Sequence, residues 1–265
     1  MSDEAPLLAT LVNGVARLTL NRPDKRNALN RATLAALGKE LERCKHDPEV
    51  RVVQLTGAGK VFTAGADLNE MQAQADATEA DNVEHAQVLA KVLAALYDLP
   101  KPTLARVNGD GFGGALGLIA ACDIVVAAED AKFAFTEVRL GIIPAVISPF
   151  VLGKIGESVA LRYFLSAEVF SAATLRQLGL AHEVVPASAL DHTCEALIAE
   201  LMKGAPGAQA EAKKLIREGG NTPADQRSAA SVQLAQRLAR LRVQPEAREG
   251  FAAFFAKRKA QWRID

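Results

Sequence analysis

Apolar residues near the start of the chain form two short runs that predict a pair of strands. Leu7 to Leu20 is divided in the middle by Asn13-Gly14. An Asn-Gly pair favours the tight two-residue turn that joins antiparallel strands, because both residues tolerate positive φ. The segment is therefore predicted to be a β-hairpin.

Farther along, short apolar runs alternate with segments whose apolar residues recur at helical spacing. Arg51–Leu55, Thr103–Val107 and Ile124–Ala128 have the length of buried strands, and Val184-Val185 adds a short one. Strands that alternate with helices indicate right-handed βα units and a largely parallel sheet. Helices are expected around Leu34, Leu37, Leu41 and Cys44, over about 83–97, after residue 113, and over about 150–165, 171–178, 188–203, 206–218, 223–242 and 246–260.

In two other segments the apolar residues recur with no clear helical period. The polar, alanine-rich stretch Met71–Asn82 is expected to be a mobile connection. Lys132–Glu137 is expected to be extended, with Phe133, Phe135 and Glu137 on one face. The chain is divided into a core at residues 1–200 and a helical C-terminal region at 201–265.

Two glycine-rich loops, Gly57–Gly65 and Gly109–Gly117, follow two of the central strands and are expected to open on the same edge of the sheet. Glycines let the backbone approach a ligand closely, and the first N–H groups of a following helix can donate to a negatively charged oxygen. Three interpretations stay open at this point. The glycines pack a helix on a sheet, form an oxyanion hole, or bind a dinucleotide, since Gly109, Gly111 and Gly114 fit G-x-G-x-x-G and Glu129 follows.

Composition and charge narrow the functional classes. The 265 residues include 31 Lys plus Arg and 31 Asp plus Glu, so no net basic field attracts nucleic acid or a membrane surface. Cys44, Cys122 and Cys194 lie far apart and have no ligand spacing to a histidine, which argues against a disulfide framework or a metal site. No secretory signal or membrane-spanning run is visible, and a cytoplasmic protein is expected.

Five motifs, in order, resemble the crotonase superfamily, the enoyl-CoA hydratase/isomerase fold. They are the CoA-cradling loop Arg26-Asn27-Ala28-Leu29, the first oxyanion motif Phe62–Leu68, the second oxyanion motif Val107–Gly114 with Ala121–Ile124, the glutamate segment Phe135-Thr136-Glu137 with Leu140–Pro144, and the CoA-touching C-terminal helix with Glu249-Gly250, Phe254 and Lys257. The resemblance covers nearly the whole chain and demotes the dinucleotide interpretation. It implies an α/β fold, a crotonase-type spiral of ββα units with a helical trimerisation region, in a homotrimer or hexamer.

The resemblance also implies roles for individual residues. The N–H groups of Ala66 and Gly114 would hold the enolate oxygen of a CoA thioester, and Glu137 would transfer protons. If Glu137 shares a face with two phenylalanines, burial should raise the pKa of its carboxyl group. Contacts with CoA or substrate are implied for Lys25, Arg26, Ala28, Ala64, Asp67, Leu68, Gly113, Gly117, Phe254 and Lys257, with Arg22 as a further cation for the phosphates. No metal is expected, and no cofactor besides the CoA of the substrate.

Two departures from the family pattern bear on the reaction. Hydratases of this family commonly have a second glutamate three residues after the second oxyanion glycine, where this chain has Gly117. Glu137 is then the sole obvious acid/base, since Asp67 is interpreted mainly as a helix cap and Asp110 is a weak candidate. The segment Ala145–Pro149, together with Gly117, resembles bacterial hydratases of glutaconyl-type thioesters such as 3-methylglutaconyl-CoA or isohexenylglutaconyl-CoA.

The sequence therefore predicts an enoyl-CoA hydratase that acts on a 2-enoyl-CoA thioester. The nearest alternative is an enoyl-CoA isomerase that uses a single glutamate. A NAD-dependent dehydrogenase and an RNA-binding crotonase relative are more remote alternatives.

Overall fold

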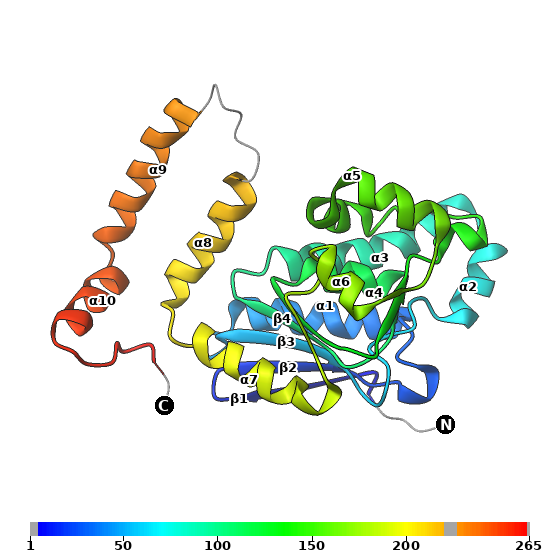
Figure 1. Cartoon of the computed structure of the whole chain (residues 1–265), viewed down its shortest axis with the longest axis horizontal. Helices are drawn as coiled ribbons and strands as arrows, with labels where there is room; N and C mark the ends of the chain where they lie inside the picture. Colours follow the sequence, from blue (N-terminus) through cyan, green and yellow to red (C-terminus); the bar gives the residue numbers. More distant parts are fainter. Residues whose placement is uncertain (1–4, 220–226, 264–265) are drawn as a thin grey trace.

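The computed structural model describes residues 5–219 and 227–263, which are built around a sheet of mostly parallel strands (Figure 1). Six described strands stand in the order β1-β2-β3-β4-β6-β9, and in this sheet only the β1–β2 pair is antiparallel. The predicted parallel sheet is confirmed. The strands are β1 (Leu7–Val12), β2 (Val15–Leu20), β3 (Val52–Gly57), β4 (Thr103–Val107), β5 (Gly111–Phe112), β6 (Ile124–Ala128), β7 (Lys132–Ala134), β8 (Phe170–Ser171) and β9 (Glu183–Val185).

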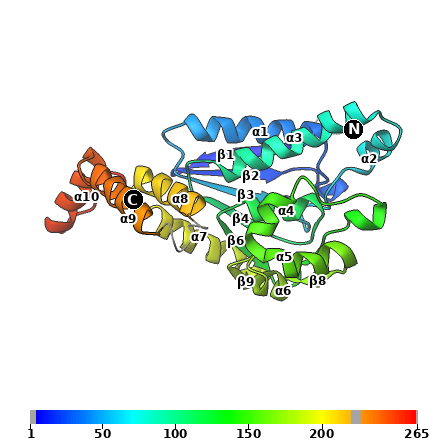
Figure 2. The ribbon, with the colours of Figure 1, turned by 90° about the horizontal axis from the view of Figure 1, so that it is seen from above.

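Helices cover both faces of the sheet (Figure 2). Val53 and Leu55 of β3 pack into the large core with α1, α3 and α4, whereas Val52 packs into a smaller cluster with α7. Because both faces of β3 are covered, Val52, Val53 and Leu55 are all buried, and the strand lacks the strict apolar–polar alternation of a half-exposed strand. The helices are α1 (Arg31–His46), α2 (Leu68–Ala75), α3 (Glu79–Tyr97), α4 (Gly114–Ala121), α5 (Ser148–Ser166), α6 (Ala172–Gln177), α7 (Leu190–Leu201), α8 (Pro206–Gly219), α9 (Arg227–Arg242) and α10 (Pro245–Phe255), with 3-10 turns η1 (Pro23–Lys25), η2 (Glu137–Leu140) and η3 (Ala187–Ala189).

The N-terminal hairpin forms as predicted. Val12 pairs with Val15 across the turn, and the two residues between them, Asn13 and Gly14, have φ of 49° and 78°. Positive φ at both central residues is typical of the type I′ turn, whose twist matches that of antiparallel strands.

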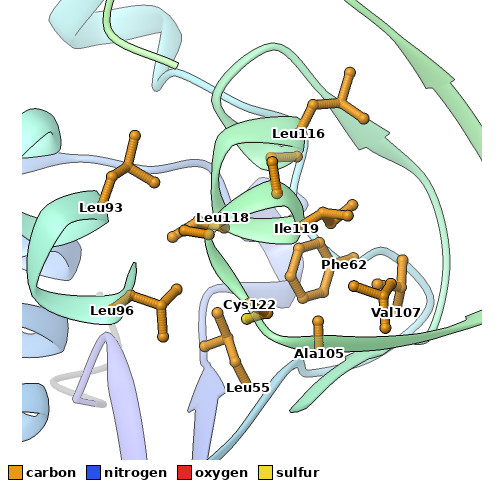
Figure 3. Close-up of a cluster of buried hydrophobic side chains, with 14 of the residues drawn as sticks. Leu55, Phe62, Leu93, Leu96, Ala105, Val107, Leu116, Leu118, Ile119 and Cys122 are labelled. Carbon is orange, nitrogen blue, oxygen red and sulfur yellow. The ribbon is translucent and has the colours of Figure 1, made fainter. Parts of the chain in front are cut away.

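Helix α4 lies inside the core and not on the surface (Figure 3). All of its residues from Ala115 to Ala121 are buried, and Leu116, Leu118 and Ile119 belong to the same cluster as side chains of β3, β4 and α3. A helix that is apolar all round is expected to be buried on every side. The N-terminus of α4 is thereby fixed at the end of the second glycine-rich loop.

A second, three-stranded sheet brings the segment before Glu137 to this loop. Gly111 and Phe112 of β5 pair with Phe133 and Ala134 of β7, and β8 pairs with β7 on its other side. Residues that are far apart in the sequence therefore meet at the N-terminus of α4.

Helices α8, α9 and α10 extend away from the sheet (Figures 1 and 2). Lys213 and Arg217 of α8 donate to the two carboxylate oxygens of Asp123 at 2.7 and 3.0 Å, which attaches this helix to the end of α4. The described part of the C-terminal region is helical as expected, and the domain division near residue 200 stays a prediction.

The predicted mobile connection at Met71–Asn82 is wrong. Helix α2 runs to Ala75 and α3 begins at Glu79, where Thr78 and Asp81 form a capping box. Helix α2 has no buried residue, so its sequence carries no apolar stripe that would indicate a helix.

The extended segment after β7 stops earlier than predicted. Phe133 and Phe135 are fully buried, but Thr136 has helical dihedrals and Glu137 begins η2. Glu137 therefore does not continue the face of the two phenyl rings, because side chains alternate only along extended backbone.

Two predicted helix boundaries also differ at the C-terminal end. Helix α10 ends at Phe255, not at residue 260, and Lys257, with φ of 52°, lies beyond it. Residues 223–226 of the helix predicted over 223–242 lie outside the described residues.

Candidate active site

The Asn27 side chain connects the segment around Arg22 to the first glycine-rich loop, Gly57–Gly65. Its buried side chain donates through Nδ2 to the carbonyl oxygens of Ala58 and Val61 at 2.8 and 2.7 Å, and its Oδ1 accepts from the N–H of Arg22 at 2.9 Å. Asn27 has φ of 54°, in the left-handed region that asparagine tolerates. From the sequence, Asn27 was predicted only as part of the CoA-cradling loop Arg26–Leu29. An asparagine within a polar loop is the signal that could have indicated its structural role.

The N–H group of Ala66 points away from the neighbouring loop. Ala66 forms a parallel bridge with Leu29, in which Leu29 N donates to Gly65 O at 2.7 Å and Asp67 N donates to Leu29 O at 3.3 Å. In such a bridge the residue between these two peptide groups directs its own N–H to the other side. Ala66 is exposed, and no hydrogen bond among the described residues uses its N–H.

A second free N–H group belongs to Gly114, the first residue of α4. A helix offers no partner to its first N–H, and no other described group accepts this one. The preceding residue, Gly113, has φ of 52° and donates to Ala134 O at 3.0 Å. Gly113 is thus held by β7, and the N–H of Gly114 next to it stays without an acceptor among the described residues.

The two loops touch at Gly65. A Cβ atom built on Gly65 would lie 2.6 Å from Phe112 O and 3.9 Å from Gly113 Cα, and the φ of Gly65 is 88°. A side chain at Gly65 would therefore push the loops apart. Glycine at this position keeps the free N–H groups of Ala66 and Gly114 near each other.

The Glu137 carboxyl group lies beside Gly113. Its Oε1 would be 3.3 Å from a Cβ on Gly113, and its Oε2 is buried without a hydrogen-bond partner among the described residues. Burial raises the pKa of the Glu137 carboxyl group, and its own backbone N–H opposes this only in part. The predicted direction of the pKa shift is confirmed, although the phenyl rings of Phe133 and Phe135 are not on its face.

Ile147 fills the space beside Gly117. A Cβ built on Gly117 would lie 2.4 Å from Ile147 Cγ2 and 3.2 Å from Leu93 Cδ1, closer than side chains normally approach. Ile147 is only 2% exposed and directly precedes α5. The structure therefore places Gly117 against apolar side chains, and the contribution of Ile147 was not predicted from the sequence.

The site thus combines two free N–H donors on adjoining loops with one buried carboxyl group. Such donors stabilise an oxygen on which negative charge develops, and a carboxyl group with a raised pKa can move a proton near neutral pH. A model of the enoyl-CoA hydratase/isomerase family matches residues 10–264 of the chain. The chain belongs to the enoyl-CoA hydratase/isomerase family. It is a hydratase/isomerase-type enzyme, and this membership argues against the dinucleotide interpretation of the glycine-rich loops.

Relatives from this family match almost the whole chain. The 2,3-dehydroadipyl-CoA hydratase of Escherichia coli K12 is 34% identical over 258 residues, which cover 97% of this chain and 98% of that protein. A mevalonyl-coenzyme A hydratase of Aspergillus fumigatus is 35% identical over 257 residues, with coverages of 93% and 90%. The crystal structure of an enoyl-CoA hydratase from Shewanella pealeana has a TM-score of 0.91 at 39% identity and covers 97% of this chain and 96% of its own. The predicted crotonase-type α/β fold is confirmed.

The residues predicted to bind CoA in the first loop lie next to this site. Lys25 and Arg26 are exposed, and the guanidinium of Arg26 is 3.7 Å from the Asp110 carboxylate. Ala64 N donates to Arg26 O at 2.9 Å, which joins the first glycine-rich loop to this segment, and Ala28 is nearly buried between them. The other carboxylate oxygen of Asp110 accepts from Lys132 N at 2.9 Å, so this acid supports the loops.

Arg22, the further cation predicted for the phosphates, is paired with Asp67 in this structure. Its Nη1 donates to Ala28 O at 2.7 Å and to Asp67 Oδ2 at 2.8 Å. Asp67 also accepts from Asn69 N at 3.0 Å, which confirms it as the cap of α2. Burial alone would raise the pKa of Asp67, but the bonds from Arg22 and Asn69 hold it below its ordinary value. Leu68, directly after it, is 79% exposed.

Phe254 and Lys257 do not reach this site within one chain. Phe254 lies on α10, at the end of the molecule opposite to α2 (Figure 2), and lines a cavity of about 960 Å³ between α8 and α10. The structure of a single chain therefore brings together the predicted residues of the loops and Glu137, but not those of the last helix.

Other kinds of site find little support in residues 5–219 and 227–263. No three His, Cys, Asp or Glu side chains there are grouped to hold a metal ion, and no helix there is long and apolar enough to cross a membrane. Cys44, Cys122 and Cys194 are free and buried, and burial raises the pKa of Cys122 and Cys194 to about 12.

Proposed function

We propose that this enzyme adds water across the 2,3 double bond of an enoyl-CoA thioester. The observation that carries the proposal is the buried, unpartnered Oε2 of Glu137, beside Gly113 and one residue from the free N–H of Gly114. Leaving a buried acceptor unpaired costs about 1–3 kcal/mol, so such a group calls for an explanation. In the proposal, the missing partner of this oxygen is the attacking water molecule.

The free N–H groups of Ala66 and Gly114 would form an oxyanion hole. When the water oxygen bonds to the β-carbon, the π electrons shift and negative charge develops on the thioester oxygen. Two donors aimed at that oxygen stabilise it more than they stabilise the neutral substrate. The bridge to Leu29 and the burial of α4 fix both donors in advance, so little reorganisation is needed.

Glu137 would carry out both proton transfers. Its carboxylate takes a proton from water as the new C–O bond forms, and the carboxylic acid then returns a proton to the α-carbon. The product is a 3-hydroxyacyl-CoA, and the carboxylate is regenerated. A second acid at Gly117 would collide with Ile147, so one group serves both steps. Its raised pKa brings the protonated form closer to working pH.

We extend the proposal to acyl chains of the glutaconyl type, which end in a carboxylate. The E. coli relative is named for 2,3-dehydroadipyl-CoA, whose acyl chain also ends in a free carboxylate. The exposed cations Lys25 and Arg26 would meet the phosphates of CoA, and no cofactor besides this CoA would be required.

Phe254 and Lys257 fit the proposal if they come from a neighbouring copy of the chain. Phe251, Phe254 and Phe255 are 52%, 77% and 76% exposed, and a monomer rarely leaves such an apolar cluster uncovered. We therefore propose a homotrimer or a dimer of trimers in the cytoplasm. Light scattering after size-exclusion chromatography gives the mass directly, and a monomer in dilute solution would contradict this assembly.

An enoyl-CoA isomerase is the second candidate. Ile147 occupies the space that a second acid at position 117 would need, which leaves one carboxyl group. This favours the isomerase, because one carboxylate is enough to take a proton from one carbon and return it to another. Product mass separates the two reactions, since only hydration adds the mass of a water molecule.

The test uses crotonyl-CoA and 3-methylglutaconyl-CoA side by side, with the wild type and Glu137→Gln. The substitution should lower kcat for hydration at least about a hundredfold and leave binding of the CoA ester nearly unchanged. Glu129→Gln is the matched control, because Glu129 is exposed and its side chain is not part of the site. Unchanged turnover in Glu137→Gln would remove Glu137 from the mechanism. An isomerised product without hydration would contradict the hydratase and support the isomerase.

A further inference from the structure

A second cavity, of about 380 Å³, lies where α8 meets the body of the molecule. It is lined by the end of α4, so the eight residues of that helix, about 12 Å at 1.5 Å per residue, separate it from the N–H of Gly114. Most of its walls are apolar. They are formed by Tyr97, Pro102, Ala120, Ile124, Leu201 and Ile216.

The charged side chains that line this cavity do not balance. Three of them are cations, Lys154, Lys213 and Arg217, and only Asp123 is a carboxylate. Lys213 and Arg217 donate to the two oxygens of Asp123, and the backbone N–H and hydroxyl of Thr103 also donate to it, at 2.8 and 3.0 Å. The carboxylate is therefore fully used by other donors.

Lys154 is the cation left over. Its Nζ donates to Cys122 O at 2.8 Å, and no carboxylate of the described chain lies within ion-pair distance of it. Arg217 has a further, longer contact of 3.7 Å with the exposed Asp98, which does not reach Lys154. Burial lowers the pKa of both Lys154 and Lys213, which means that their ammonium groups have lost much of their water. The attraction of Asp123 opposes this shift in Lys154 only in part, because Asp123 is already bonded to Lys213 and Arg217. A desolvated ammonium group with no carboxylate in ion-pair contact attracts an anion strongly.

We propose that this cavity binds a small hydrophobic carboxylic acid, with its carboxylate on Lys154 and its apolar body against Tyr97, Leu201 and Ile216. The charged end follows from the unbalanced ammonium group, and the apolar end follows from the walls. A volume of about 380 Å³ is within the range of small-molecule sites, about 300–1,000 Å³. An inorganic anion would leave the apolar walls exposed to water, so it should bind more weakly than an acid with a hydrocarbon chain. The site is separate from Glu137 and does not depend on the reaction that the enzyme catalyses.

Calorimetric titration of the full chain with octanoate tests this inference. Octanoate should bind, and octanamide, which has nearly the same shape without the charge, should bind at least tenfold more weakly. Inorganic phosphate and acetate should show little binding at the same concentrations. Lys154→Met should weaken octanoate at least tenfold. Lys214→Met is the matched control, because Lys214 lies on α8 but does not line the cavity.

A second variant removes the space and keeps the charge. Ala212 lines the cavity, and the phenyl ring of Ala212→Phe should occupy part of it and also weaken octanoate at least tenfold. Thermal melts confirm that each variant is folded. Neither substitution touches the loops around Glu137, so the turnover of the CoA thioester should stay unchanged. Equal binding of octanoate and octanamide, or full octanoate affinity in a folded Lys154→Met, would overturn the proposal.

Discussion

Replacing Gly114 with proline tests the proposed oxyanion hole with little other disturbance. Proline lacks the N–H group, so the substitution removes one of the two free donors. Gly114 is the first residue of α4, the position at which a helix tolerates proline best. The preceding residue is a glycine, and without a Cβ it escapes part of the usual clash with a following proline ring.

The size of the effect follows from the number of donors. Loss of one of two preorganised donors typically lowers kcat about 10²–10³-fold, or about 2.7–4 kcal/mol. Because the charge develops only in the transition state, the affinity for the CoA ester should change little. The assay is hydration kinetics at several substrate concentrations, together with a thermal melt to show that Gly114→Pro folds.

Gly114→Ala is the matched control. It keeps the N–H group, and its Cβ would lie 3.4 Å from Leu29 Cδ1 and 3.7 Å from Leu89 Cδ2, which are ordinary contacts. The alanine variant should therefore keep most of the activity. If the folded proline variant retains wild-type kcat, or if alanine and proline lose the same amount, Gly114 N–H does not hold the oxyanion.

Two further predictions concern stability. Gly117→Ala should lower the free energy of unfolding by about 1–3 kcal/mol, because its Cβ would meet Ile147 Cγ2 at 2.4 Å. Ile147→Ala is destabilising by itself because Ile147 is buried, but Gly117→Ala should cost less in that background than in the wild type. Gly153→Ala in α5, where a Cβ meets nothing within 4 Å, is the control in urea melts and should not destabilise. The raised pKa of Glu137 makes the folded state bind more protons than the unfolded state above the ordinary value of 4.5, so wild-type stability should fall as pH rises through the window above it. Glu137→Gln lacks this loss, and its melting temperature should exceed that of the wild type near neutral pH but not near about pH 4; a difference that is constant with pH would contradict the buried, ionised carboxylate.

The strands and long helices were predictable because their apolar patterns are dictated by burial. β3, β4 and β6 were found from short apolar runs, since a parallel strand is covered on both faces. Helix α2 was missed for the same reason, because a helix with no buried residue leaves no apolar stripe in the sequence. Elements such as α2 depend on long-range contacts, and these contacts cannot be inferred from a single sequence.

In the candidate site, too, side-chain roles could be predicted from the sequence, whereas contacts between distant segments could not. Glu137 could be proposed from its own residue type and motif, whereas the donors Ala66 and Gly114 are backbone groups whose freedom depends on a bridge to Leu29 and on the start of a helix. The pairing of Arg22 with Asp67 could not be predicted either, because the two residues are brought together only when the loops fold. Local motifs thus led to the chemistry that we propose, whereas the fold determines which cations are already paired with a carboxylate.

Gly117 and Ile147 show why a comparison of single positions with a family motif does not explain a departure from that motif. From the sequence, position 117 is only the loss of an acid. In the structure, the same position is one half of a packed pair, because the methyl group of Ile147 occupies the space that any side chain at 117 would need. Gly117→Glu alone would therefore force a collision within the core and would not restore a second proton donor. A second acid requires both positions to change together, so the reliance on Glu137 that we propose is a property of the packing around α4 and not of one substitution.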